Sequence, residues 1–275
     1  MPEHSYDALL EARYRERHAG ATDERLTHNP VLRTLLQHRT VRQYDDRPVE
    51  PHVLHAILAA AQSASSSSNL QAWSVVVVED AARKARLAAH AGNQAHIAQA
   101  PVVLVFLADL ARLRGIAQDC GMAGDGLDYL EATVIGIADA ALAAQNAVVA
   151  LESMGLGACY IGAMRNHPEK IAAELALPKE TFAVFGLTIG YPHPDVATDI
   201  KPRLPQPVVV HREQYRANPQ ALPDYDQRMR EFQAEQGMQD THWTAKSARR
   251  ITGIPALTGR HRLREALAGF GIKLL

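Results

Sequence analysis

The stretch that decides the fold is residues 143–166, AAQNAVVALESMGLGACYIGAMRN. It completes a run of Ala, Ile, Val and Leu that begins near Thr133 and predicts one long helix, because alanine has the highest helix propensity. Gly155-Leu156-Gly157 ends that helix, as glycine does at a helix C-terminus. The following ACYIG predicts a strand, so a long apolar helix leads directly into the core.

The segments on either side of this stretch alternate between helical and extended patterns. Helical spacing or capping predicts helices over residues 31–37, 52–64, 81–89 and 168–175. Strands are predicted at residues 75–78, 102–109 (VVLVFLAD) and 182–192 (FAVFGLTIGYP). The unbroken apolar character of VVLVFLAD indicates a strand buried on both faces. No linker is long enough to separate independent domains, so the pattern predicts one compact α/β unit.

The two ends of the chain differ from this alternating region. Residues 1–28 are charged and predict an N-terminal helical extension, which leaves residues 29–275 as the main domain. Residues 207–210 predict a short strand between two proline-containing segments, with no neighbouring hairpin partner. We expect that strand to pair with another subunit.

Composition excludes several classes of function. The chain has 275 residues, of which 47% are hydrophobic, and 29 Lys and Arg residues stand against 30 Asp and Glu residues. A net charge of -1 provides no general attraction for nucleic acid or for an anionic membrane surface. Two cysteines, Cys120 and Cys159, suit a reducing compartment, and the charged N-terminus does not resemble a secretory signal. The chain is therefore expected to be cytoplasmic.

Residues 133–154 are apolar enough to raise the alternative of a membrane-spanning helix. Polar side chains interrupt the run at Asp139, Gln145, Asn146 and Glu152, and charged residues are rare in such spans. A buried helix is favoured, and its many alanines also suit close packing at a subunit interface.

Two basic clusters could together bind an anionic ligand. The first is His38-Arg39-Thr40-Val41-Arg42 and the second is Lys201-Pro202-Arg203. Arginine binds phosphate oxygens with two parallel hydrogen bonds, so these clusters suit a phosphate monoester if the fold brings them together. Taken singly, each cluster is better explained as a solvated surface segment with ion pairs that contribute only about 0–1 kcal/mol each.

Three further segments could contact a planar polar ligand. The serine tract Ser65–Asn69 joins a helix to a strand over few residues, which favours an ordered, hydroxyl-rich loop over a flexible linker. Gln94 offers an amide, although a helix-capping role is the simpler explanation. In Tyr160-Ile161-Gly162-Ala163, glycine would allow a flat ring to approach the backbone, and a tight turn without a ligand is equally compatible.

Other familiar motifs are missing from the sequence. The order of Gly155-Leu156-Gly157, after a helix and before a strand, is the reverse of a dinucleotide-binding fingerprint. There is no HExxH, no paired CxxC and no GxSxG, so a metal site and a serine hydrolase are both disfavoured. The residues alone indicate an α/β protein with a phosphate-bearing ligand.

Six segments in order resemble the nitroreductase family, in its oxygen-insensitive NADPH nitroreductase and NADPH-flavin oxidoreductase branch. They cover roughly residues 30–215 and read HRTVRQY, SSSSNLQAW, GNQAHIAQAP, AAQNAVVALESMGLGACYIGAMRN, FGLTIGYP and KPRLP. The resemblance implies an α+β fold with a mixed, antiparallel-rich sheet flanked by helices. It also implies a homodimer in which a C-terminal strand is exchanged between subunits.

The resemblance further implies FMN bound at the dimer interface. Motif matching assigns the FMN phosphate to His38, Arg39, Thr40, Arg42, Lys201 and Arg203. Ser66 and Gln94 would bond the flavin, and Ile161, Gly162 and Ala163 would line its ring with backbone groups. Ser68 and Asn69 would lie beside the acceptor, where related enzymes commonly carry an aromatic residue in place of Asn69.

The reaction implied by the resemblance is a ping-pong transfer of hydride from NADPH or NADH through flavin N5 to a nitroaromatic, quinone or flavin. This would explain why no protein nucleophile or acid-base pair stands out. The arginines that would bind an NADPH 2'-phosphate are not matched, and Arg228, Arg230, Arg249 or Arg250 are the candidates to replace them. The alternative functions are a flavin-binding or sequestering protein without nicotinamide turnover and, more remotely, a non-redox scaffold.

Overall fold

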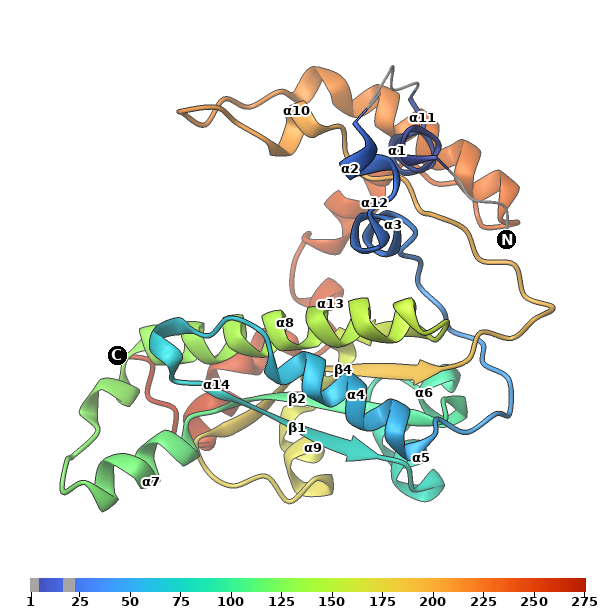
Figure 1. Ribbon diagram of the computed structural model, residues 1–275. Coiled ribbons are helices and arrows are strands. Elements are labelled where there is room, and N and C mark those ends of the chain that lie inside the picture. The colour runs from blue at the N-terminus through green and yellow to red at the C-terminus, as the bar shows by residue number, and fades with distance from the viewer. Residues whose placement is uncertain (1–4, 17–22) are drawn as a thin grey trace. The chain divides into compact units, whose positions relative to one another are not determined.

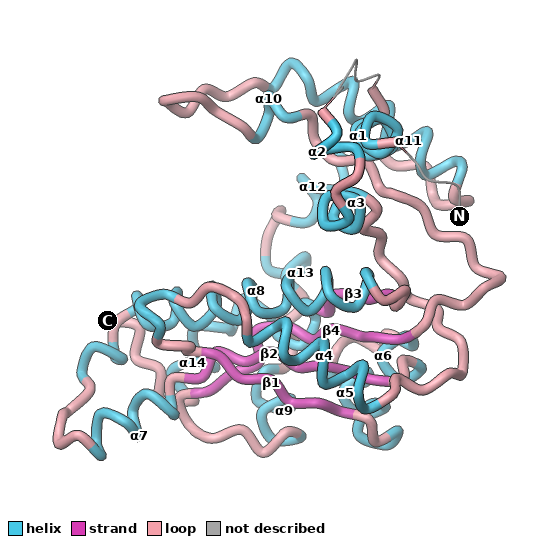
Figure 2. The backbone as a smooth tube through the Cα atoms, in the orientation of Figure 1, coloured by secondary structure: helices cyan, strands magenta, loops and turns pink. Residues whose placement is uncertain are grey.

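A four-stranded antiparallel sheet forms the centre of one compact unit of the protein, Thr40–Val196 with Leu257–Leu275. The structure is a computed structural model and describes residues 5–16 and 23–275. The strands are β1 Trp73–Val78, β2 Val102–Asp109, β3 Gly157–Ile161 and β4 Thr181–Gly190. Their order is β1-β2-β4-β3, and Figure 2 shows them side by side in magenta.

The central strand β2 explains how the sheet is buried on both faces. Successive side chains of a strand point to opposite faces. Leu104 and Phe106 pack into one hydrophobic cluster, and Val103 and Val105 pack into the other. All four side chains are fully buried. The prediction from the unbroken run VVLVFLAD is confirmed.

Helices cover the two faces separately (Figure 1). The first cluster adds residues of α4 Pro51–Gln62, α8 Leu130–Ser153 and α14 Leu263–Gly269. The second adds residues of α5 Ala81–His90, α6 Ala95–Gln99 and α9 Pro168–Glu174. The remaining helices of this unit are η1 Ser67–Asn69, α7 Ala111–Asp119, η2 Asp125–Asp128, η3 Gly162–Arg165 and η5 Arg260–Arg262.

Among the described residues, helix α8 is long enough and apolar enough in composition to span a membrane. Its buried side, which includes Ala140, Ala144 and Leu151, packs in the core of the sheet unit. Asp139 on the same helix is 1% exposed. The prediction of a helix that supplies part of the core is confirmed.

The second compact unit, Met1–Arg39 with Ala197–Ala256, consists of helices and loops over its described residues. Tyr225, Met229 and Phe232 of α11 form its small apolar core, against Leu204 and Trp243. Its helices are α1 Tyr6–Tyr14, α2 Glu24–Thr27, α3 Pro30–Leu36, α10 Gln206–Val209, η4 Pro219–Ala221, α11 Leu222–Glu235 and α12 Trp243–Arg250. Helix α13, Ile254–Leu257, ends where the chain returns to the sheet unit.

One expectation differs from this arrangement. The strand predicted at residues 207–210 is wrong, because Pro207 sets a helical φ and residues 206–209 form α10. Val210 N donates to Gln206 O over 2.7 Å and closes that turn. The described N-terminal residues, 5–16 and 23–39, group with Ala197–Ala256, and an N-terminal extension over residues 1–28 stays a prediction. Units assembled from distant segments need no linker, so sequence composition carries no signal for them.

Candidate functional site

The two basic segments of the helical unit, His38–Arg39 and Lys201–Arg203, are linked through the side chain of Arg13. Arg13 Nη2 donates to His38 O over 2.8 Å, and Arg13 Nη1 donates to Lys201 O over 2.9 Å. A second link joins the same segments, because Arg39 Nε donates to Thr198 Oγ1 over 3.0 Å. The structure therefore brings together four of the predicted phosphate residues, His38, Arg39, Lys201 and Arg203.

This donor set fits a phosphate group. Arg39 uses its Nε within the protein, and its terminal guanidinium nitrogens make no ion pair with any described residue. Arg203 is exposed, and its Nη1 reaches Lys201 O at 3.3 Å. Fixed cations on two adjacent strands of irregular backbone are suited to bidentate binding of phosphate oxygens. These segments could therefore hold the phosphate of FMN.

The other two predicted phosphate residues, Thr40 and Arg42, belong to the sheet unit. Thr40 forms an isolated parallel bridge with Ala158 on β3, and Val41 N donates to Ala158 O over 2.9 Å. This bridge adds a parallel partner to an otherwise antiparallel sheet. The close approach requires glycine at position 157, because a Cβ there would lie 2.4 Å from Val41 Cγ2.

Helix α6 carries a histidine that the sequence did not single out. His96 Nε2 is buried without a hydrogen-bond partner among the described residues. Burial, together with the charge of nearby Arg42, lowers the pKa of His96, so its imidazole is neutral at pH 7. Gln94 begins this helix, and its Nε2 donates to Ala91 O over 2.8 Å. An unsatisfied imidazole nitrogen beside Arg42 is the expected mark of a polar ligand site.

The serine tract is ordered by a buried carboxylate. Asp139 Oδ2 accepts hydrogen bonds from Ser66 Oγ over 2.7 Å and from Ala72 N over 3.0 Å, and Oδ1 accepts one from Ser67 N over 3.1 Å. The single hydroxyl proton of Ser66 is therefore donated within the protein, although its oxygen still accepts a bond from Gln71 N. Asp139 had stood out in the sequence only as an interruption of an apolar run.

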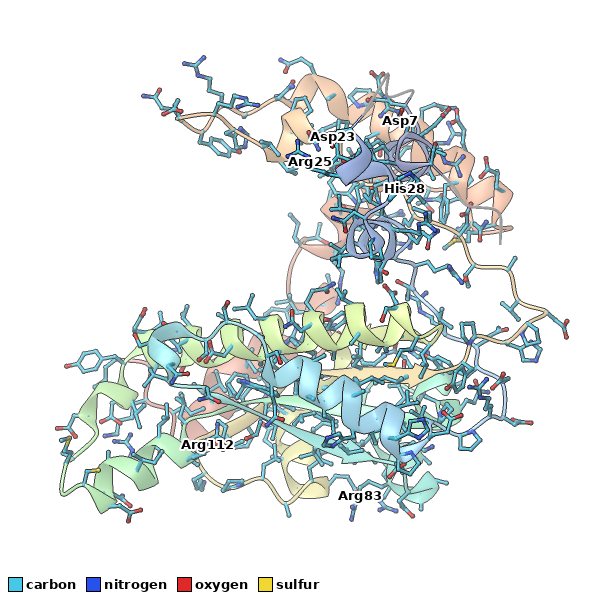
Figure 3. All side chains as sticks on the ribbon, viewed as in Figure 1. Asp7, Asp23, Arg25, His28, Arg83 and Arg112 are labelled. Carbon is cyan, nitrogen blue, oxygen red and sulfur yellow. The ribbon has the colours of Figure 1, made fainter. Side chains whose placement is uncertain are left out.

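The tip of this loop adopts an unusual backbone conformation. Ser68, Asn69 and Gln71 all have positive φ, at 48°, 55° and 50°. Non-glycine residues rarely adopt this conformation, and they do so where surrounding contacts enforce it. Arg112, labelled in Figure 3, adds an outer support, because its Nη2 donates to Trp73 O over 2.8 Å and also to Gln71 O. Ser68 and Asn69 are thereby held exposed at the tip.

The end of β3 offers backbone in place of side chains. Ile161 is 2% exposed and packs in the core, and Gly162 begins η3 immediately after it. A Cβ at Gly162 would meet Arg165 at 3.5 Å, an ordinary contact, so the surface there is open. Any ring placed against residues 161–163 would contact main-chain groups, as the resemblance implied for Ile161, Gly162 and Ala163.

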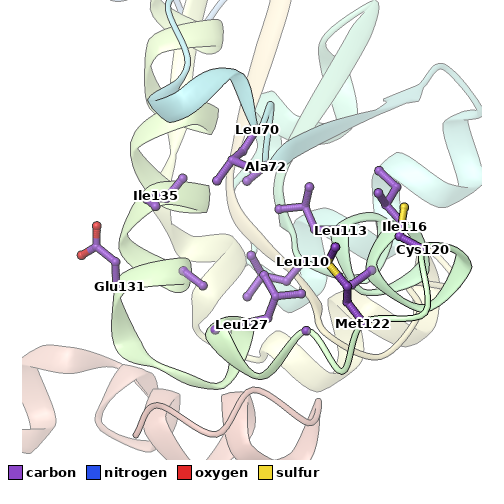
Figure 4. A pocket seen from close by; sticks show the side chains of 14 residues that line it. Leu70, Ala72, Leu110, Leu113, Ile116, Cys120, Met122, Leu127, Glu131 and Ile135 are labelled. Atoms are coloured by element: carbon purple, nitrogen blue, oxygen red, sulfur yellow. The ribbon is translucent and has the colours of Figure 1, made fainter.

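An apolar cavity of about 440 Å³ begins next to Asn69, at Leu70 and Ala72 (Figure 4). Leu110, Leu113 and Ile116 from the α7 side and Ile135 of α8 line it, with the exposed thiol of Cys120 at its edge. This volume is typical of small-molecule sites. No sequence pattern had indicated it, because its lining comes from four separate segments.

Among residues 5–16 and 23–275, no group of three or more His, Cys, Asp or Glu side chains is placed to bind a metal ion. Two buried or partly buried acidic side chains near the site, Asp139 and Asp109, already have partners in the protein. Asp139 binds the serine loop, and Asp109 accepts from Ser74 Oγ over 2.5 Å and pairs with Arg112.

Comparison with known proteins identifies the class to which this fold and these segments belong. The family model described as "Nitroreductase family" matches residues 35–191, and that of its C-terminal domain matches residues 201–274. The chain therefore belongs to the nitroreductase family. The α+β fold inferred from the resemblance is confirmed by solved structures of this family.

Two curated relatives and one solved structure show how similar the chain is to individual members of the family. The NADPH-flavin oxidoreductase of Vibrio harveyi is 40% identical over 207 residues, covering 75% of this chain and 83% of the relative. The oxygen-insensitive NADPH nitroreductase of Salmonella typhimurium is 39% identical over 210 residues, covering 76% and 85%. The solved structure of the Vibrio harveyi NADPH:FMN oxidoreductase with NAD+ matches with a TM-score of 0.79 at 34% identity, covering 89% of this chain and 99% of that one.

Proposed function

We propose that this protein is an FMN-dependent NAD(P)H oxidoreductase that reduces nitroaromatic, quinone or flavin acceptors. The observation that carries the proposal is the pairing of the His38–Arg39 and Lys201–Arg203 segments through Arg13 and Thr198, in a chain of the nitroreductase family. Both relatives are named for NADPH-dependent reduction of flavin or nitro compounds.

Different residues are proposed to contact the phosphate and the flavin ring of FMN. His38, Arg39, Thr40, Arg42, Lys201 and Arg203 would bind the FMN phosphate. Ser66, Gln94 and the backbone of residues 161–163 would contact the flavin, and the unsatisfied His96 Nε2 is available as a further polar contact. When bound, FMN supplies the two-electron chemistry that carries hydride from nicotinamide to acceptor in two half-reactions. The protein's own residues bind, orient and exclude water.

Acceptor binding is proposed at the tip of the serine loop. Ser68 and Asn69 are exposed there, and the apolar cavity opens beside them at Leu70. An aromatic acceptor suits this combination, because its ring can bury apolar surface while a polar group meets the amide of Asn69. The supporting observation is that hydrogen bonds to Asp139 and from Arg112 order this loop.

Selectivity for NADPH is proposed to depend on Arg249. Arg228 pairs with Glu16 and Arg230 with Asp240, and Arg250 Nη1 donates to Ala256 O. The guanidinium of Arg249 is exposed and forms no ion pair with any described residue. Among the four candidates it is therefore the one that a 2'-phosphate can recruit without breaking an ion pair or side-chain hydrogen bond to another described residue.

A homodimer is proposed on the exposed side of α8. Leu130, Val134 and Leu142 are 53%, 50% and 47% exposed, and Ile137 lies between them at 38%. These positions follow helical spacing and form one apolar stripe, with small Ala138 and Ala141 exposed beside it. A second copy of the chain would cover such a stripe with its own. A cytoplasmic location is proposed as well, because a chain of this length with only two cysteines suits a reducing compartment.

One anaerobic titration tests the proposed activity. Purified protein should be yellow with bound FMN, and NADPH or NADH should bleach the flavin absorbance. A nitroaromatic or quinone should then restore the colour in stoichiometric amount. Flavin that stays bound but is bleached by neither nicotinamide would select the alternative of a flavin-sequestering protein, and a colourless protein that FMN does not reconstitute would reject both.

A further inference from the structure

The N-terminal helix α1 contributes a buried guanidinium to the helical unit. Family matching begins at residue 35, well after Tyr6–Tyr14. Arg13 lies in the last turn of α1 and is only 5% exposed. Arginine keeps its charge in proteins, so its burial requires that its donors be satisfied by hydrogen bonds.

This guanidinium donates to three backbone carbonyls, two in the basic segments and one at the helix end that precedes the first of them. Nη2 donates to Leu36 O and to His38 O, each over 2.8 Å, and Nη1 donates to Lys201 O over 2.9 Å. In return, Arg203 N donates to Arg13 O over 3.0 Å. Leu36 is the last residue of α3, where carbonyl groups lack partners within the helix and a cation is favourable.

The rest of α1 is attached to the helical unit by other contacts. Arg15 pairs with Glu235 through two hydrogen bonds of 2.7 and 2.5 Å and lies over the ring of Phe232. Arg228 Nη1 donates to Tyr14 O over 3.1 Å and also pairs with Glu16. Docking of α1 therefore has its own anchors, and the bonds of Arg13 are directed to the segments that carry His38, Arg39, Lys201 and Arg203.

We propose that Arg13 is a positioning residue for the cofactor's phosphate. Its guanidinium binds the carbonyls of His38 and Lys201 at the same time. It thereby sets the distance between the two segments that carry the cationic side chains of Arg39 and Arg203. The N-terminal helix is thereby a working part of the cofactor site. The inference rests on the proposed function, because it takes the phosphate of FMN as the ligand of these segments.

The test compares two flavins that differ only in the phosphate. Flavin-free, full-length wild type, Arg13→Met, Arg13→Lys and Arg15→Met are titrated with FMN and with riboflavin by flavin fluorescence. Arg13→Met should weaken FMN binding by about 10- to 100-fold, the worth of one or two charge-assisted hydrogen bonds, and change riboflavin binding by less than about threefold. Arg13→Lys keeps the charge without the fork and should lie between wild type and Arg13→Met.

The Arg15→Met variant is the matched control. It removes a guanidinium two residues away, at the C-cap of the same helix, which pairs with Glu235 and Phe232, and it should leave the ratio of FMN to riboflavin affinity unchanged. An equal loss of both flavins in Arg13→Met, or no loss of either, would overturn the inference. If circular dichroism shows Arg13→Met to be unfolded, the ratio of FMN to riboflavin affinity in Arg13→Lys tests the inference in its place. A wild type that binds neither flavin refutes the proposed function itself.

Discussion

Two irregular stretches of backbone in this protein are each held by one buried charged side chain, and the two charges have opposite signs. In the sheet unit, Asp139 is 1% exposed and accepts hydrogen bonds from two backbone N–H groups and one hydroxyl of the serine loop. In the helical unit, Arg13 is 5% exposed and donates to three backbone carbonyls. Each ion satisfies polar groups that no regular secondary structure supplies with partners.

The surroundings of the two ions differ, and so should the consequences of removing them. Asp139 lies on α8 within the large core of the sheet, where unsatisfied groups cannot reach water. Arg13 lies beside a core of few residues, chiefly Tyr225, Met229 and Phe232. We expect substitutions around Asp139 to change global stability and substitutions in the helical unit to change ligand affinity. The predictions below test that contrast.

The largest effect is expected at Asp139. Asp139→Ala leaves one buried and two partly buried donors without their acceptor and opens a small cavity, which should lower the free energy of unfolding by about 2–4 kcal/mol. Urea unfolding followed by circular dichroism measures this. Asp125→Ala, an exposed aspartate of η2, is the control and should stay within about 0.5 kcal/mol of wild type. A loss below about 1 kcal/mol at Asp139 would remove the contrast between the two units.

The next effect is expected at Gly157. Gly157→Ala places a methyl group 2.4 Å from Val41 Cγ2 and should push the Thr40–Arg42 segment away from β3. Overpacking of this kind costs about 1–3 kcal/mol. Thermal unfolding provides the measurement. Gly115→Ala makes the same chemical change inside α7, where no atom lies within 4 Å, and should raise stability slightly because alanine favours helix. Equal effects at the two glycines would contradict the close approach described here.

A smaller effect is expected at Arg249, in the helical unit, and it should appear in binding only. Loss of an exposed charge that meets a 2'-phosphate is worth about 1 kcal/mol, so Arg249→Ala should raise the KM for NADPH about 3- to 10-fold. The KM for NADH and the unfolding midpoint should not change. Arg230→Ala removes a guanidinium already paired with Asp240 and serves as the control. If the KM values for NADPH and NADH rise equally, Arg249 does not bind the 2'-phosphate.

The smallest effect concerns pH and His96 in the sheet unit. Burial and Arg42 lower the pKa of His96 below its ordinary value near 6.5, so as pH falls the unfolded chain takes up the proton first. The stability associated with neutral His96 is complete above about pH 6.5 and is lost progressively below it. His96→Gln should therefore flatten the decline in stability between pH 6.5 and 5. An identical slope in wild type and variant would show that the imidazole titrates as it does in solvent.

The sequence predicted the regular elements well because their causes are local. The unbroken run of β2 and the glycines after α8 each specify their element through neighbouring residues. The sequence also named His38, Arg39, Lys201 and Arg203 as partners, and the structure links their segments. The strand predicted at residues 207–210 is wrong. Valines favour a strand, but Pro207 adopts a helical φ and Val210 N donates to Gln206 O, which closes a helical turn.

The two buried ions could not be predicted, because their partners are backbone groups far away in the chain. Asp139 binds a loop about 70 residues earlier, and an isolated aspartate in an apolar run gives no indication of such a contact. Arg13 stands in a charged N-terminal segment, where arginine is usually solvated. His96 was missed for a related reason, since one histidine among 13 becomes distinctive only when its nitrogen is found buried and unsatisfied.

The split origin of the helical unit has a consequence for how the protein is made. Its first segment ends at Arg39 and its second begins at Ala197, so the ribosome must add all the intervening residues before Lys201 can meet Arg13. At roughly 5–20 residues per second, that delay is on the order of 10–30 s. The inner strand β4 ends at Gly190, so the sheet itself is completed only shortly before Lys201 is added. Cofactor capture is therefore one of the last events of biosynthesis.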